Sequence, residues 1–307
     1  MSTQKNNSWL HAYAVFLACA TFLLIVAGAL VTSNDAGLSV PDWPTSFGTF
    51  RMPRMVGGVL YEHGHRMIAA TVGLLTVILA VWMWLKEPRR WLRWVSGIAV
   101  LAVIAQGVLG GITVLFYLPV VVSVGHATLA QSVFCATVSL SLFARPDWRW
   151  DEAKMEDLSA PSLRQLSVVT SAAILLQLVL GAAFRHNGIG IVPHIVVALV
   201  VTLLVTWTAM RVFTKFSSER RLVRSAGALV GLLLVQLFLG VGAYMMKIAA
   251  QNAPQPLPPV VNVTTAHVAV GALVLAASVV LALQVFRLVA SPCRAPALGE
   301  ASEKAAV

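Results

Sequence analysis

Eight apolar stretches, each long enough to cross a lipid bilayer, dominate this chain of 307 residues. A membrane-spanning helix needs about 20 mostly apolar residues. Charged residues make up 11% of the chain, against about 25% in soluble domains, which excludes a soluble fold. The expected fold is an all-α integral membrane protein with eight transmembrane helices near residues 12–32, 64–85, 94–115, 120–143, 165–185, 193–213, 225–246 and 262–288.

The basic residues predict how these helices are oriented. The net charge is +10, but the 22 lysines and arginines are spread over the connections, so we expect contact with membrane lipid and no nucleic-acid binding. Seventeen of them lie at the two ends of the chain and in the even-numbered connections, against five elsewhere. By the positive-inside rule both termini are cytoplasmic, in a bacterial cytoplasmic membrane with a retained first helix. The loop near 33–61 then lies outside, where it can cap a bound group.

A short pattern recurs along the chain and indicates a duplication. Glutamine four residues before glycine occurs at Gln106–Gly110, Gln177–Gly181 and Gln236–Gly240, with a weaker echo at Leu24–Gly28. Such glycines let helices approach closely or pack on a cofactor, and the glutamines are expected to hydrogen-bond between helices. We expect two duplicated four-helix bundles with pseudo-twofold symmetry. The predicted division is a tail at 1–11, a first bundle at 12–143, a linker at 144–163, a second bundle at 164–288 and a tail at 289–307.

A histidine follows each of these glycines, just inside the start of the next helix: His65, His126, His194 and His267. Any one of them alone is readily explained as a polar residue tolerated near the membrane surface. Four at one level, one per repeat, indicate cofactor sites built from facing helices. Imidazole pairs suit haem iron, and no thiolate or carboxylate cluster indicates another metal. The sequence therefore predicts two haem sites, one between His65 and His126 and one between His194 and His267.

Glu62 makes the two predicted sites unequal. It lies three residues before His65, on the same helical face, and so beside the edge of a bound haem. A carboxylate there can accept a proton or stabilise a developing cation during oxidation of a ring substituent. An ordinary ion pair at the membrane surface is the alternative. The corresponding positions before the other histidines cannot ionise: Ser123, Ile191 and Thr264.

Two arginines lie near the outer helix ends, where haem propionates need cations. Arg66 follows His65 directly, and Arg185 ends the fifth apolar stretch. Arg66 also lies four residues after Glu62, so a helical ion pair between these two residues is the alternative to propionate binding.

The residues quoted so far resemble the haem A synthase family over essentially the whole chain apart from its tails. The most specific part is AGLSVPDWP at residues 36–44 followed by Glu62-His63-Gly64-His65-Arg66. The resemblance implies oxidation of the C8 methyl group of haem O to the formyl group of haem A through a hydroxymethyl intermediate. It implies that His65 and His126 hold the substrate haem, that His194 and His267 hold a haem b cofactor, and that Glu62 is catalytic. The implied protein partners are a haem O synthase and a terminal cytochrome oxidase.

The chain departs from this resemblance in its cysteines. Some bacterial members of the family carry a cysteine pair on either side of Pro-Asp-Trp-Pro, and here Val40 and Ser46 take those places. The three cysteines present, Cys19, Cys135 and Cys293, have no metal-ligand spacing, and we assign no disulfide.

Two other classes of protein remain open. A dihaem electron-transfer protein explains the four histidines equally well, but it leaves Glu62 and the loop motif without a role. A transporter with repeated halves explains the duplication, but not the gathering of histidines at one face.

Overall fold

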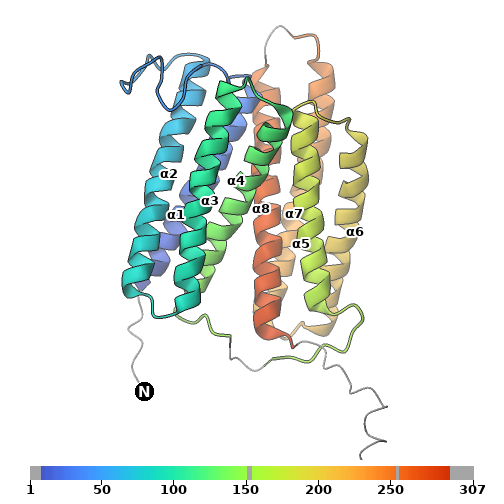
Figure 1. Ribbon diagram of the computed structural model, residues 1–307. Coiled ribbons are helices and arrows are strands. Elements are labelled where there is room, and N and C mark those ends of the chain that lie inside the picture. Colours follow the sequence, from blue (N-terminus) through green and yellow to red (C-terminus); the bar gives the residue numbers. More distant parts are fainter. Residues whose placement is uncertain (1–7, 151–153, 254–255, 291–307) are drawn as a thin grey trace, which may run out of the picture.

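The computed structural model describes residues 8–150, 154–253 and 256–290. Within them the chain forms eight long helices, and each helix is long and apolar enough to cross a membrane (Figure 1). The predicted all-α membrane fold is therefore confirmed. The connections between the helices are short except at residues 34–57 and 144–162. The helices are α1 (Ser8–Ser33), α2 (Gly58–Lys86), α3 (Arg90–Leu115), α4 (Val120–Phe143), α5 (Leu163–Arg185), α6 (Val192–Lys215), α7 (Arg220–Ala249) and α8 (Pro258–Leu288).

Most helices extend beyond the apolar stretches that predicted them. At the start of α5, Ser162 and Gln165 form a capping box in which each side chain bonds the other's backbone N–H, and this satisfies groups that a helix end leaves unpaired. Prolines lie in the first turns of α6 and α8, where a missing N–H costs nothing. Helix α2 begins at Gly58, six residues before the apolar run, and so includes Glu62.

The helices pack as two groups that lie side by side in Figure 1. Helices α1 and α3 both pack against α2 and α4, while α5 and α7 both pack against α6 and α8. One cluster of buried apolar side chains lies mainly in each group. The groups meet where α1 and α4 contact α8 and where α4 contacts α5. The duplication and its pseudo-twofold symmetry stay predictions.

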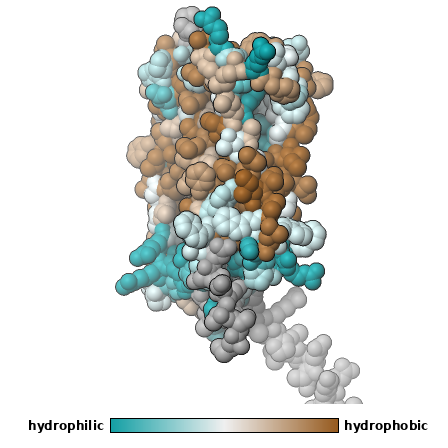
Figure 2. Space-filling model, turned by 90° about the vertical axis from the view of Figure 1, so that its left-hand side faces the viewer, coloured by the Kyte–Doolittle hydropathy of each residue, from teal (hydrophilic) through white to brown (hydrophobic). Residues whose placement is uncertain are grey.

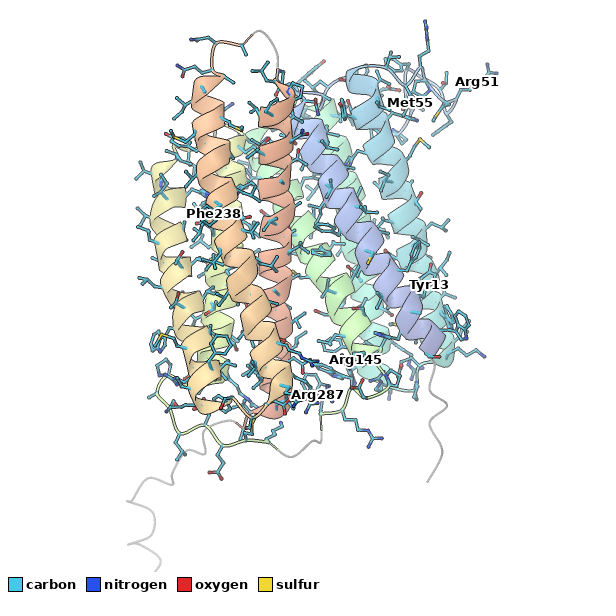
Figure 3. The ribbon with its side chains drawn as sticks, turned by 180° about the vertical axis from the view of Figure 1, so that it is seen from behind. Tyr13, Arg51, Met55, Arg145, Phe238 and Arg287 are labelled. Carbon is cyan, nitrogen blue, oxygen red and sulfur yellow. The ribbon has the colours of Figure 1, made fainter. Side chains whose placement is uncertain are left out.

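The surface fits a bilayer. A hydrophobic band crosses the middle of the face in Figure 2, between hydrophilic residues at both ends. Large apolar side chains such as Phe238 on α7 (Figure 3) point away from the protein and are exposed. Lipid tails can cover such residues at no cost, because they are as apolar as the side chains themselves.

Loop 34–57 and the starts of the four even-numbered helices lie at one end of the molecule, which we call the histidine end (Figure 1). At the opposite end, Arg287 joins the two groups of helices. It is 1% exposed, donates a 2.6 Å hydrogen bond to the backbone oxygen of Asp147, and lies 4.7 Å from the ring centre of Trp148. Arg287 therefore connects the end of α8 to the segment that follows α4.

Replacing Arg287 with alanine is expected to destabilise the protein by about 2–3 kcal/mol, because a buried hydrogen bond, a cation–π contact and their packing are lost together. The measurement is thermal unfolding in detergent. Arg145→Ala is the control, because Arg145 pairs with the Asp147 carboxylate at the surface and such pairs contribute about 0–1 kcal/mol. Equal shifts for both variants would contradict the role given to Arg287.

Candidate functional site

Each of the four predicted histidines lies against a glycine of the preceding helix. If the glycine carried a Cβ atom, that atom would meet Cε1 of the imidazole first, at a distance that leaves little or no room. These distances are 3.1 Å for Gly28 and His65, 3.1 Å for Gly110 and His126, 2.9 Å for Gly181 and His194, and 3.0 Å for Gly240 and His267. Real Cβ contacts are seldom so short, so the absence of a side chain at each glycine makes room for the imidazole.

The four imidazoles also share one orientation. In every pair, Cε1 is nearest the glycine, Nδ1 is next and Nε2 is farthest. Among the described residues, the buried Nδ1 atoms of His65, His126 and His267 have no hydrogen-bond partner. The repeat read from the sequence is thus a packing unit. In three of the repeats, Nε2 of the histidine lies beside the amide of the repeat's glutamine, at 3.4 Å for His126, 3.2 Å for His194 and 3.4 Å for His267.

His194 and His267 face each other in the second group of helices. Their ring centres are 6.4 Å apart, with the ring planes at 75°. Bonds from a metal to imidazole nitrogen are about 2 Å long, so a metal between two imidazoles needs ring centres roughly 6 Å apart. Spacing and donor type of this pair therefore fit haem iron held by two histidines.

The glutamines of the repeat connect neighbouring helices. Gln106 Nε2 donates to the backbone oxygen of His126 at 3.0 Å, and Gln177 Nε2 donates to that of His194 at 2.9 Å. Gln236 Nε2 lies 3.4 Å from Nε2 of His267 on the next helix, so the predicted interhelical role is confirmed at all three glutamines. The first repeat has Leu24 in this place, so it lacks this interhelical bond.

Glu62 is buried at the histidine end and has two partners. Its Oε1 accepts a 2.5 Å hydrogen bond from Arg66, and its Oε2 accepts a 2.7 Å bond from the backbone N–H of Val40. Arg66 also donates to the backbone oxygens of Val40, Asp42 and Thr45 at 2.8, 2.7 and 3.1 Å. The ion pair anticipated from the sequence is present, and it holds loop residues that the sequence did not connect to it.

The segment held in this way has further contacts with the helices. His63 Nδ1 lies 2.9 Å from the hydroxyl oxygen of Ser46. A Cβ on Gly111 of α3 would lie 2.6 Å from the indole of Trp43. Both Val40 and Ser46, the positions singled out for lacking cysteine, are buried.

A turn organised by Asp42 shapes the same segment. Its carboxylate accepts hydrogen bonds from the Thr45 hydroxyl and from the backbone N–H groups of Phe47 and Gly48. These bonds, the Thr45 hydroxyl foremost, lower the pKa of Asp42 from 3.8 to about 2. Because the carboxyl pKa is lower in the folded turn than in the unfolded chain, the charged carboxylate stabilises the turn at pH values above the unfolded pKa. This stabilisation is lost as the pH falls towards 2. The turn is therefore fully supported near neutral pH.

Arg185 lies between the two groups of helices. Its Nη2 donates to the Ser33 hydroxyl at 2.6 Å and to the backbone oxygen of Ala29 at 3.3 Å, both on α1. Ser33 in turn bonds Thr264 and Thr265 on α8. In the described part of the chain, Arg185 forms no ion pair within 4 Å. Its positive charge is thus available to an anionic group such as a propionate.

Three residues at this end have contacts that the sequence did not predict: Trp43, His63 and Ser33. His63 lies two residues from His65, on another side of α2, and bonds loop residue Ser46 there. Trp43 and Ser33 carry no ionisable group, and only the approach of other elements gives them contacts.

With the geometry described, the chain can be compared with known proteins. Residues 11–194 match the family COX15-CtaA, described as cytochrome oxidase assembly protein. Three similar proteins are named heme A synthase. The protein from Lysinibacillus sphaericus is 26% identical over 186 residues, 60% of each chain. That from Symbiobacterium thermophilum is 31% identical over 186 residues, 58% of this chain and 60% of its own. That from Shewanella oneidensis is 30% identical over 185 residues, 54% of each chain.

The matched stretches span 54–60% of the length of these three relatives. The family match takes in α1 to α5 and the first residues of α6, and with them His65, His126 and His194. Because residues 11–194 are more than half of the 307 residues, this chain belongs to the COX15-CtaA family of cytochrome oxidase assembly proteins.

Proposed function

We propose that this protein is a membrane oxidoreductase of the haem A synthase type. The single observation that carries the proposal is a buried carboxylate, Glu62, one helical turn from His65 and absent from the other three repeats. The substrate in this proposal is haem O, and the product is haem A. Conversion of the methyl group to a formyl group with oxygen from water (–CH3 + H2O → –CHO + 4 H+ + 4 e−) releases four protons and four electrons per haem, and the electrons pass to an external electron acceptor.

The four histidines divide between substrate and cofactor. His65 and His126 hold the substrate haem in the first group of helices, with Glu62 at its edge. His194 and His267 hold a resident haem b in the second group, with Arg185 near a propionate. The resident haem supplies one-electron transfer when bound. Support comes from the 6.4 Å spacing of His194 and His267 and from the like orientation of all four imidazoles.

Two contacts of Glu62 favour its charged form, whereas its burial opposes the charge. Bonds from the Arg66 guanidinium and the Val40 N–H both favour the anion. An anionic carboxylate beside the oxidised methyl group can take up a released proton or stabilise positive charge at that carbon. Arg66 donates to three loop oxygens and to Glu62, so its main task in this proposal is to hold Glu62 and the loop rather than a propionate.

The proposed setting is a bacterial cytoplasmic membrane, with both termini in the cytoplasm and both haem sites near the outer face. The distribution of lysine and arginine supports this orientation. The proposed protein partners are a haem O synthase, which supplies the substrate, and a terminal cytochrome oxidase, which receives the product.

The test is Glu62→Gln. The amide oxygen can still accept from Val40, but the charge is gone, so haem should remain bound while haem A formation falls by about 100-fold or more. Acid extraction and mass spectrometry should then find haem O or its hydroxymethyl derivative. Glu87→Gln is the matched control, because Glu87 is also buried and paired with an arginine, at the other end of α2. Haem A formation at the normal rate in Glu62→Gln would remove Glu62 from the mechanism.

A dihaem electron-transfer protein is the second candidate, and one observation favours it: the histidine–glycine packing is the same in all four repeats. Haem extraction from the unaltered protein separates the candidates. An electron carrier yields haem b alone, whereas the enzyme also yields haem O, haem A or the intermediate.

A further inference from the structure

Residues 40–46 cross the histidine end of the first group of helices. From α2, Arg66 donates to the backbone oxygens of Val40, Asp42 and Thr45, and Glu62 accepts from the N–H of Val40. A second connection to α2 joins Ser46 to His63. These bonds attach both ends of the segment to one helix.

The middle of the segment reaches a different helix. Trp43 lies against Gly111 of α3, at a position where a Cβ atom would be 2.6 Å from its indole. The adjacent residue, Gly110, is the one that packs on His126. Trp43 thus packs one residue away from the glycine that contacts the proposed ligand His126. Arg66, which is next to the other proposed ligand His65, binds the loop backbone on both sides of Trp43.

The rest of the loop differs from this segment. Its two ends are buried, with Val40 0% and Ser46 5% exposed, and Trp43 between them is 39% exposed, whereas none of residues 47–57 is buried. Few buried contacts mean a low local free energy of opening. Residues 47–57 can therefore move together with residues 40–46 if the contacts of residues 40–46 to α2 and α3 are released.

We propose that residues 40–46 form a cover over the His65/His126 site, which Trp43 closes and which Arg66, as a positioning residue, holds in place. A closed cover keeps water away from the reacting edge, and an open one gives a large ligand a way in or out. That the covered ligand is a haem rests on the function proposed above. The contacts that make the cover do not depend on it.

The first test measures the cover itself, with or without haem. Hydrogen–deuterium exchange of the full-length protein in detergent reports on the backbone amides of residues 40–46, among them that of Val40. Gly111→Ala places a methyl group where the indole lies and should speed exchange in this segment. Gly107→Ala, on the same helix with nothing within 4 Å of an added Cβ, should not. Trp43→Ala removes the contact from the other side and should act like Gly111→Ala.

The second test measures release of bound haem to apomyoglobin, with mass spectrometry of the haem captured. Gly111→Ala and Trp43→Ala should release the haem of the His65/His126 site roughly tenfold faster, because lost contacts act mainly on dissociation rates. Release of haem b should be unchanged. Arg66→Gln should release the first haem faster than Arg66→Lys, which keeps the charge and part of the bonding.

Each outcome decides a separate point. Equal exchange rates in Gly111→Ala and Gly107→Ala would overturn the cover. Equally faster release of both haems would overturn it too, since that result indicates a general loosening of the protein. A protein that holds no haem would end the proposed function, but the exchange measurement would still decide whether the cover exists.

Discussion

Replacing His267 with alanine is expected to remove the haem of the second group of helices and leave the other in place. His267 and His194 face each other at a spacing that fits one metal atom between them. Without His267, only one of the two proposed imidazole ligands remains in this group of helices. Bound haem should fall from about two to about one per chain, and extraction should show the loss of haem b.

The reciprocal variant sharpens this expectation. His65→Ala should lose the substrate haem and retain haem b, which gives the opposite extraction pattern from the same protein. His11→Ala is the control, because His11 belongs to the same group of helices but lies near the backbone oxygen of Ser141 at the opposite end. Loss of both haems from either ligand variant, or of neither, would show that the histidines do not act as the two proposed pairs.

The eight helices were predictable because the bilayer constrains them so strongly. An apolar run of about 20 residues has few folds open to it, and the structure has a helix at every predicted position. The helix ends were less predictable. Beyond the bilayer a helix is free to continue through polar residues and prolines, as α8 does at Pro258. Hydropathy alone therefore does not set the boundary.

The candidate site likewise has one part that the sequence predicts and one part that it does not. The pairing of histidines follows from their equal place in a repeat, which is visible in the chain. The hydrogen bonds from Arg66 to the loop are not visible in the sequence, because Arg66 binds backbone oxygens, which every residue possesses. Trp43 illustrates this limit: its partner, Gly111, is 68 residues away in the sequence, and the contact depends on a close approach that no local pattern records.

The packing of imidazole on glycine gives the second large expected effect. In Gly240→Ala, the added Cβ would lie 3.0 Å from Cε1 of His267, so the ring has to move or turn. Ligand positions tolerate only about 0.5 Å of displacement, and changes to groups that orient a ligand typically cost about 10–100-fold in affinity. The affinity of the second site for haem should fall by that factor, measured by titrating haem into the depleted protein.

The control for this variant lies on the same helix. Gly231→Ala meets nothing within 4 Å, and alanine is favoured over glycine in a helix by about 1 kcal/mol. Gly231→Ala should therefore leave the haem-free protein at least as stable as before and bind haem normally, whereas Gly240→Ala should bind haem more weakly. The difference between the two variants separates the contact with His267 from a general effect of alanine in this helix. If Gly240→Ala binds haem as tightly as Gly231→Ala, the glycine serves helix packing alone, and the repeated contact does not orient the ligand.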